Sequence, residues 1–414
     1  MRPILRLRRI LLLPTILSIL VFGAGPSYAA PPPLKLDARS AVLLDFTTGQ
    51  VLLEQNGDSP AIPASLTKLV TLHLAYKALA EGKVKPEDRV QIREEAWAAK
   101  LPGSSVMFLE PGQVVTFAEI VKGITIPSGN DASIAMAQHL AGTVQNFAAE
   151  MNKEMAALGF STMQFVDPHG LSSRNQVTAR EFAEFARIYV QKNPQALTEL
   201  HSVREFRYPL WENLSPQART GVTRERHQPI LQYNRNGLLD DEGVDGLKTG
   251  FVDQSGYNIA LTAKRGEMRL VAVIMGVGIG ESEAAGSRKR EAAGRELLNW
   301  GFQNFITFKP PVPAAKPVRV WKGSVNQLAL EPATAPILTL ERGQETRLTQ
   351  TVHQETDTVA PVKKGAKLGE IIYAADGKEI ARVPLVAAAD LPQGGLFKRI
   401  WDSIQMTVIS WFKK

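Results

Sequence analysis

The sequence predicts an α+β fold: an antiparallel sheet flanked by helices and an all-helical lobe, then a small all-β domain and an amphipathic helix. Three observations predict this fold. Strand patterns lie near both ends of the first 300 residues, helical patterns fill the stretch between them, and prolines cluster after residue 308. The distant strands share one sheet if the chain returns to it after the helices. The join between sheet and helical lobe is where we expect a cleft.

The N-terminus has the pattern of a secretory signal peptide. A basic n-region with four arginines precedes an apolar run from Ile10 to Phe22, and small residues follow up to Ala29. That order is typical of a cleaved leader. A membrane span is less favoured, because the apolar run is short and contains Pro14. We therefore expect residues 1–29 to be a signal peptide, and the mature protein to be exported to the outer face of the plasma membrane.

The charge of the chain gives no basis for a nucleic-acid partner. The formal charge is +7, of which four arginines in the leader contribute +4 and residues 396–414 contribute +3. The body of the protein is therefore neutral, without the basic footprint that nucleic acid requires. The chain also has no cysteine. This excludes thiol catalysis, and an exported chain must then be stabilised by burial of its core.

The first 300 residues alternate between strand and helix signals. Residues 38–58 predict two strands joined by a turn at Thr47-Thr48-Gly49, and apolar residues recur at helical spacing from Thr67 to Gly82. Helical patches then run from Pro86 to Gln191: "TFAEIVKGI", "DASIAMAQHLAG", "NFAAEMNKEMAALGF" and "TAREFAEFARIYVQK". Residues 256–278 predict a hairpin that turns at Arg265-Gly266-Glu267. A helix from Glu281 to Trp300 completes this part.

Composition changes at "FKPPVPAAKPVRVWKG", where prolines cluster and helix-forming residues become rare. Residues 309–392 are predicted to form a small all-β domain, with a hairpin turn at Asp376-Gly377. Residues 395–414 predict an amphipathic helix. Its apolar side chains fall within an arc of roughly 120° at helical spacing: Phe397, Ile400, Trp401, Ile404, Val408, Trp411 and Phe412. We expect this helix to lie on a membrane surface through residues 396–414; the alternative is docking on the β domain or a partner.

Three short motifs could act together. Ser65 and Lys68 stand on one face at the start of the predicted helix, and a desolvated lysine can activate a serine nucleophile. Taken alone, Ser65 is better explained as a helix cap and Lys68 as a side chain that reaches solvent. However, Ser128-Gly129-Asn130 follows 63 residues after Ser65, and Lys248-Thr249-Gly250 follows 120 residues after Ser128. Taken alone, Ser128-Gly129-Asn130 would predict a helix cap and Lys248-Thr249-Gly250 a turn. All three motifs together, in this order, indicate a catalytic site.

In this order the motifs resemble the S-x-x-K, S-x-N and K-T-G set of penicillin-binding proteins and serine β-lactamases. Longer segments resemble low-molecular-mass D-alanyl-D-alanine carboxypeptidases of the peptidase S11-like family, over about residues 36–303. They include "ASLTKLVT", "GSSVMFLEPG", "GITIPSGNDASIAMA", "FVDPHGLS", "QYNRNGLL" and "VDGLKTGFVDQSGYNIALTA". The later β segment and the C-terminal helix fit the family's appended domain and anchor.

The resemblance implies a transpeptidase-like catalytic domain over residues 30–305 and a β-sandwich-like domain over residues 309–392. It also implies a serine-type carboxypeptidase that trims peptidoglycan stem pentapeptides to tetrapeptides, with β-lactam antibiotics as covalent inhibitors. Ser65 would attack the carbonyl of the penultimate D-alanine, Lys68 would take its proton, and Ser128 would relay a proton to the leaving amine. Lys68 can do so only if its pKa falls well below about 10.4, and Lys248 nearby is expected to lower it.

The remaining matched residues would bind substrate. Asn130 would hold the substrate backbone and Lys68. The terminal carboxylate would bind Lys248 and Thr249, with Arg235 as a supporting cation. Gly250 would allow an extended peptide to lie against the strand edge. The backbone N–H groups of Ser65 and Phe251 would form the oxyanion hole.

The chain departs from the family pattern at Phe251, where many relatives have a histidine. The oxyanion contact uses the backbone, so the reaction is expected to survive, although any effect of that histidine on binding or deacylation is missing. A β-lactamase of the same superfamily is one alternative, but no E-x-x-L-N motif occurs between Asn130 and Lys248. A DD-endopeptidase and a catalytically silent peptidoglycan-binding scaffold are the others, and the intact motifs count against the scaffold.

Other candidates for chemistry are weaker. The six histidines have no G-x-S-x-G elbow to pair with and form no zinc-binding motif. His169 in "DPHGLS" is predicted to be structural rather than catalytic. The "GVGIG" at residues 276–280 has the wrong glycine spacing for a dinucleotide loop and is predicted to be a strand end. No cofactor or metal is therefore predicted.

Overall fold

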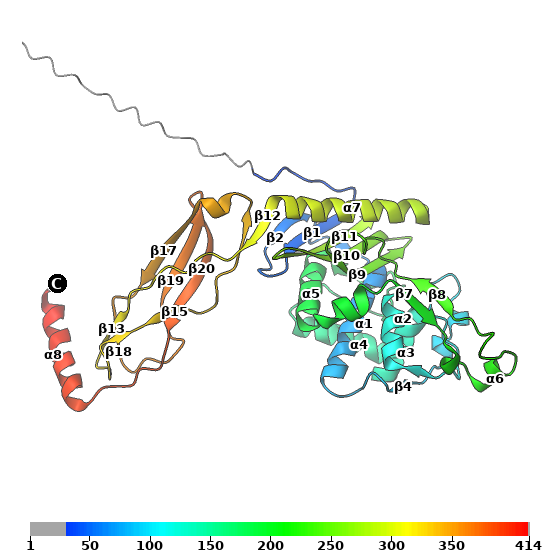
Figure 1. The fold of residues 1–414 in the computed structure, drawn as a ribbon, viewed down its shortest axis with the longest axis horizontal. Helices are drawn as coiled ribbons and strands as arrows, with labels where there is room; N and C mark the ends of the chain where they lie inside the picture. The colour runs from blue at the N-terminus through cyan, green and yellow to red at the C-terminus, as the bar shows by residue number, and fades with distance from the viewer. Residues whose placement is uncertain (1–29, 413–414) are drawn as a thin grey trace, which may run out of the picture.

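The computed structural model describes residues 30–412, so the predicted signal peptide lies outside the described residues. Figure 1 shows a sheet covered by one long helix on one face and by a group of helices on the other. An elongated β-rich part follows, and the last helix lies at the far end of the molecule. The predicted α+β class is confirmed, since sheet and helices pack in separate layers.

The central sheet has the strand order β2-β1-β11-β10-β9, and every neighbouring pair is antiparallel. The predicted first hairpin is confirmed as β1 (Ser40–Asp45) and β2 (Val51–Gln55). The predicted second hairpin is confirmed as β10 (Gly256–Arg265) and β11 (Met268–Val277). The K-T-G motif lies on β9 (Val244–Val252), which pairs only with β10 and is therefore an edge strand of this sheet.

Both faces of the sheet are buried. In β1, Ala41 and Leu43 belong to the core that lies under α7 (Glu283–Asn304), whereas Val42 and Leu44 belong to the core of the helical lobe. The alternation follows from the two-residue period of a strand. The apolar run in β1 is therefore that of a strand covered on both sides.

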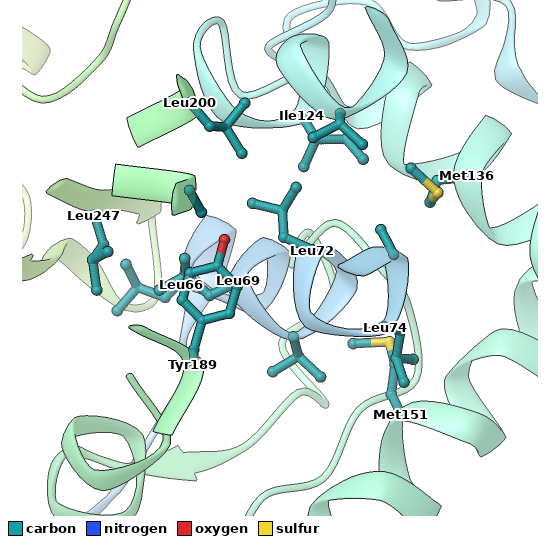
Figure 2. Packing of buried hydrophobic residues seen from close by; sticks show 14 of the residues in the cluster. Leu66, Leu69, Leu72, Leu74, Ile124, Met136, Met151, Tyr189, Leu200 and Leu247 are labelled. Atoms are coloured by element: carbon teal, nitrogen blue, oxygen red, sulfur yellow. The ribbon is translucent and has the colours of Figure 1, made fainter. Parts of the chain in front are cut away.

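The helical lobe is built around α1 (Lys68–Ala80), whose residues from Lys68 to Ala75 are all buried and mostly apolar. Figure 2 shows its leucines, including Leu69 and Leu72, packed among side chains of the surrounding elements. A helix with apolar residues on every face is stable only inside a core. The remaining helices of the lobe correspond to the four predicted patches: α2 (Phe117–Thr125), α3 (Asn130–Ala141), α4 (Val144–Ala157) and α5 (Ala179–Lys192).

One expectation about α1 needs correction. We expected Ser65 to stand with Lys68 at the start of the helix, but α1 begins at Lys68. The four residues before it form the 3₁₀ turn η1 (Ala64–Thr67), which contains Ser65. Ala64 has a φ of +49°, a left-handed value that a continuous α-helix cannot include.

Short elements connect these parts. Two-stranded pairings join β3 to β6, β4 to β5, and β7 to β8. A π-helical turn, η4 (Leu197–His201), precedes β7. The bounds of the short strands and of the short helix are β3 (Pro60–Ala61), β4 (Arg89–Val90), β5 (Val115–Thr116), β6 (Val177–Thr178), β7 (Glu205–Tyr208), α6 (Pro216–Arg219) and β8 (Ile230–Tyr233).

The C-terminal part is a set of small sheets. Between residues 309 and 392, all of which the structure describes, there is no α-helix. The predicted hairpin at Asp376-Gly377 is confirmed. The strands form the orders β12-β16, β14-β13-β18 and β15-β20-β19-β17, with the bounds β12 (Phe305–Phe308), β13 (Val318–Trp321), β14 (Gln327–Leu328), β15 (Leu330–Pro332), β16 (Leu338–Glu341), β17 (Leu348–Gln354), β18 (Asp357–Val359), β19 (Lys367–Ala375) and β20 (Lys378–Ala387).

The buried Asp45 joins the two parts. Its carboxylate accepts hydrogen bonds from the backbone N–H groups of Thr47 and Thr48 at 2.7 and 2.9 Å, which closes the turn after β1. Its second oxygen accepts a hydrogen bond from the Thr307 hydroxyl of β12 at 2.7 Å. A charged acceptor with several donors makes a strong contact. The turn of the first hairpin is therefore also the attachment point of the β-rich part.

The last helix, α8 (Leu396–Phe412), docks on β13 through its polar side. Asp402 is buried and accepts hydrogen bonds from the Lys322 N–H at 2.5 Å and from the Lys398 ammonium at 2.8 Å. The apolar arc points away from the protein: Phe397, Trp411 and Phe412 are 91, 73 and 86% exposed. Within residues 30–412, no helix is long and apolar enough to span a lipid bilayer.

A tight contact between β9 and η1 allows a stability prediction. A Cβ atom at Gly250 would lie 2.9 Å from the Pro63 carbonyl oxygen and 3.0 Å from the Ser65 nitrogen. Gly250→Ala should therefore push β9 away from η1 and lower the free energy of unfolding by about 1–3 kcal/mol, the usual cost of overpacking. Chemical denaturation of the purified mature protein measures this change.

Gly221→Ala is the matched control, since a Cβ at Gly221 would meet nothing within 4 Å. This control should change the free energy of unfolding by less than about 1 kcal/mol. Equal stability of the Gly250→Ala variant and the wild type would contradict the close packing of β9 on η1.

Candidate active site

The side chain of Ser65 is only partly buried, unlike those of its neighbours in η1, so its hydroxyl can meet a substrate. A turn from the helical lobe holds η1 from behind. Gly170 packs so closely on this turn that a Cβ would lie 1.8 Å from the Ala64 carbonyl oxygen. Gly170 also has a φ of +91°, which favours glycine. The backbone at Ser65 is thus fixed from two sides, by Gly170 and by Gly250.

The Lys68 amine lies at the centre of the site and is fully buried. Its Nζ is 2.8 Å from Ser65 Oγ, 2.6 Å from Asn130 Oδ1 and 2.7 Å from the His169 carbonyl oxygen. The amide and carbonyl oxygens can only accept hydrogen bonds, whereas the serine hydroxyl can also donate one. A neutral amine satisfies all three partners: it donates two N–H groups to the two oxygens and accepts the serine proton on its lone pair.

Burial favours this neutral form. It lowers the pKa of Lys68 from its ordinary value to about 7, although the carboxylates of Asp167 and Asp131 act in the opposite direction. We expected Lys248, as a second cation nearby, to lower this pKa. That expectation is corrected, because loss of solvation dominates at Lys68, and repulsion between the two ammonium groups appears instead as a lower pKa of Lys248. A lysine with a pKa near 7 is suited to act as a general base near neutral pH.

Ser128 comes from the loop between α2 and α3, and Asn130 is the first residue of α3. Ser128 has a φ of +64°, a conformation that costs free energy for a residue with a side chain. Asp131 helps to hold this loop, since its buried carboxylate accepts hydrogen bonds from the N–H groups of Met107 and Leu109 at 2.9 and 3.0 Å. The loop is therefore held in a strained shape that directs Ser128 toward the sheet.

Lys248 reaches the site from β9. Its buried Nζ is 2.9 Å from Ser128 Oγ and 3.0 Å from the Thr249 carbonyl oxygen. Burial, followed by repulsion from Lys68, Arg290 and Arg235, holds its pKa well below the usual range. The two lysines thus each pair with one serine of the motif set, which places both serine hydroxyls beside an amine.

His201 positions β9 from the rear. It is completely buried, and its Nδ1 lies 3.1 Å from the carbonyl oxygen of Leu247, the residue before Lys248. Its Nε2 lies 2.8 Å from the Tyr189 hydroxyl. Burial lowers the pKa of His201 to about 4, so the ring is neutral and donates from Nδ1 while accepting at Nε2. No sequence motif pointed to this residue.

The "DPHG" turn also has a role that the sequence did not reveal. Asp167 organises the turn by accepting hydrogen bonds from the N–H groups of His169 and Ser172 at 3.0 and 2.8 Å. This directs the His169 carbonyl oxygen at Lys68. The His169 ring accepts a hydrogen bond from the Leu171 N–H at 3.2 Å, and burial lowers its pKa to about 4. The geometry fits the predicted structural role of His169.

The other predicted site residues lie around this centre. Thr249 is buried next to Lys248, whereas Arg235 is exposed and close enough to lower the pKa of Lys248. Phe251 is 41% exposed and stacks on Tyr257 with ring centroids 4.4 Å apart. Gly250 also packs closely on η1, which leaves no space for a Cβ atom there. The expectation that its missing side chain makes room for substrate stays a prediction.

Comparison with known proteins agrees with this geometry. The D-alanyl-D-alanine carboxypeptidase family (peptidase S11) matches residues 27–278, and the C-terminal domain of penicillin-binding protein 5 matches residues 309–393. The chain is 36% identical to the D-alanyl-D-alanine carboxypeptidase DacC of Escherichia coli over 400 residues, which cover 94% of this chain and 92% of that protein.

Solved structures show the same relationship. Penicillin-binding protein 5 from Haemophilus influenzae is 33% identical, with a TM-score of 0.76 over 87% of this chain and 99% of that chain. Penicillin-binding protein D2 from Listeria monocytogenes, solved with cefotaxime bound, is 25% identical, with a TM-score of 0.53 over 66% of this chain and 99% of that one. The chain therefore belongs to the D-alanyl-D-alanine carboxypeptidase family.

Proposed function

We propose that this chain removes the terminal D-alanine from peptidoglycan stem pentapeptides through an acyl-enzyme on Ser65. Family membership makes the chain a D-alanyl-D-alanine carboxypeptidase, and the proposal concerns the residues that carry the reaction. The single observation that supports it best is the contact of 2.8 Å between Ser65 Oγ and a lysine whose pKa is lowered to about 7. This is a nucleophile with its base already in place.

Acylation begins when Ser65 Oγ attacks the carbonyl carbon of the penultimate D-alanine. The serine proton passes to the Lys68 lone pair, and the new C–O bond gives a tetrahedral oxyanion. The backbone N–H groups of Ser65 and Phe251 stabilise this oxyanion. The contact between Gly250 and the Ser65 nitrogen supports this assignment, because it keeps the two donors close together.

The C–N bond then breaks, and the leaving D-alanine amine needs a proton. Ser128 donates its hydroxyl proton to the amine and is reprotonated with the proton that Lys68 took from Ser65, so that Lys68 is neutral again and no net proton is lost. The contact of 2.9 Å between Ser128 and Lys248 supports this relay. Water then attacks the acyl carbonyl carbon while Lys68 accepts the water proton. The ester C–O bond breaks, and Lys68 passes this proton to Ser65 Oγ, which regenerates the serine hydroxyl and the neutral amine.

Lys248 and Thr249 bind the terminal carboxylate of the substrate, and Arg235 adds a positive charge nearby. A carboxylate in this place favours the ammonium form of Lys248 and offsets the effect of burial. Asn130 keeps Lys68 in position and offers its amide N–H group to the substrate backbone. The peptide extends along the exposed edge of β9 as an added strand.

The β-lactam antibiotics are proposed to acylate the same serine. They carry a carboxylate and a strained amide, which correspond to the terminal carboxylate and scissile bond of the peptide. The cefotaxime complex of the Listeria relative supports this part of the proposal.

We further propose that the protein is exported by residues 1–29 and works outside the plasma membrane, in the periplasm where an outer membrane exists. Residues 30–305 form the catalytic domain, residues 309–392 the β-sandwich-like domain, and residues 395–414 the membrane-anchoring helix. The exposed apolar arc of α8 supports the last assignment, since a helix with an apolar and a basic face is suited to lie in the membrane interface.

The nucleophile can be tested by covalent labelling. A fluorescent penicillin should label the mature wild-type protein, and mass spectrometry should show conversion of a pentapeptide to a tetrapeptide. Both signals should vanish in Ser65→Ala, because this substitution removes the hydroxyl that lies 2.8 Å from the Lys68 amine. Ser172→Ala serves as a control on a nearby turn and should still be labelled. Persistent labelling of the Ser65→Ala variant would contradict the assignment.

The anchor can be tested by truncation after Gly395. Removal of α8 should release the mature protein from anionic phospholipid vesicles into the soluble fraction, while penicillin labelling stays unchanged. High salt alone should release the intact protein only in part, because burial of the apolar arc, at about 25 cal/mol per Å², is not screened. Continued sedimentation of the truncated chain would contradict the membrane role of α8.

A further inference from the structure

A polar cavity between α8 and the β-rich part has no role in the chemistry proposed above. Its volume is about 490 Å³, and it lies where α8 meets β13 at the end of the molecule farthest from the catalytic residues (Figure 1). Side chains from both elements line it, among them Arg319, Asn326, Gln327, Lys398 and Trp401. Its size is that of a small-ligand site.

The cavity carries an excess positive charge. Asp402 is neutralised by the Lys398 ammonium at 2.8 Å and by the Lys322 N–H. Arg319 is a further cation that lines the cavity. Its guanidinium stacks on the Trp321 ring at 3.5 Å from the centroid, and no carboxylate of residues 30–412 lies within ion-pair distance of it. Its one polar side-chain contact in that range is a long hydrogen bond of 3.4 Å to Gln405. Asp402 interacts with Arg319 only over a longer distance, although this interaction also lowers the pKa of Asp402. A flat, oriented guanidinium without a direct ion pair is suited to bind a phosphate group.

The cavity opens at the border of the apolar arc. Trp401 lines the cavity, belongs to the apolar arc and is 61% exposed. At 100° per residue, Lys398 and Gln405 lie about 60° and 40° from Trp401, on the side that faces the β-rich part. With the apolar arc buried about 5–10 Å in the lipid surface, Arg319 and Lys398 stand at the depth of the headgroups.

Building on the membrane association proposed above, we propose that this cavity binds the phosphate headgroup of an anionic phospholipid. Arg319 contacts the phosphate oxygens, Lys398 adds a second positive charge, and the amide side chains of Asn326 and Gln327 bond to the polar part of the headgroup. The acyl chains of this lipid extend from the cavity alongside Trp401 into the bilayer. The excess positive charge disfavours a headgroup that ends in a quaternary ammonium, such as choline.

Two arginines with equal charge allow a matched test. Arg319 lines the cavity, whereas Arg399 is exposed on α8 about 160° from Trp401, away from the apolar arc. Sedimentation with vesicles that contain phosphatidylglycerol in phosphatidylcholine measures the affinity of the full mature chain. Arg399→Gln should weaken binding by about fivefold, the general effect of one basic residue near an anionic surface. Arg319→Gln should weaken it by about thirtyfold, because it also loses charge-assisted hydrogen bonds.

Arg319→Gln should lose more vesicle affinity than Arg399→Gln, and this difference should be smaller on vesicles of pure phosphatidylcholine. Arg319→Lys should recover part of the lost affinity. Equal losses in Arg319→Gln and Arg399→Gln would overturn the headgroup site but leave the anchor intact. An equal loss of Arg319→Gln on both kinds of vesicle would also overturn it, since Arg319 would then merely hold the helix. If instead the proposal that α8 anchors the protein is wrong, the chain truncated after Gly395 will still sediment with the vesicles.

Discussion

The three contacts around the Lys68 amine are the constraint on which the rest of the catalytic unit depends. Each contact comes from a different part of the chain: Ser65 from η1, Asn130 from the start of α3, and the His169 carbonyl oxygen from the turn that Asp167 organises. A neutral amine satisfies two acceptors and one hydroxyl without placing a charge in the buried site. The apolar core around α1 thus both stabilises the fold and sets the protonation state of the base.

Two buried lysines have different tasks in one site. In the proposed mechanism, Lys68 is neutral before the substrate arrives, whereas Lys248 becomes charged when the substrate carboxylate binds. Burial lowers the pKa of both, and repulsion between them adds to the effect at Lys248. The substrate supplies the missing negative charge at Lys248, so binding and correct protonation are coupled. The two lysines reach the site from separate elements, Lys68 from α1 and Lys248 from β9.

Much of the fold could be predicted from the sequence, because strand alternation, hairpin turns and helical periodicity are local signals. Ser65, Lys68, Ser128 and Lys248 could be found because their motifs are local as well. The His169 carbonyl and His201 could not, since backbone acceptors and buried positioning residues leave no motif. The cause of the lowered pKa of Lys68 depends on burial, which only the assembled core creates. The position of Gly250 against η1 likewise follows from a packing contact between segments nearly 200 residues apart.

The protonation state of Lys68 in the free protein tests the account most directly. The ε-carbon chemical shift of isotopically labelled lysine, followed by NMR across a pH titration and assigned with Lys68→Arg, gives this pKa. The account predicts a value of about 7, and the rate of penicillin acylation should reach half its maximum near the same pH, falling about tenfold for each pH unit below it. A pKa near the ordinary value of about 10.4 would contradict the neutral base on which the account depends.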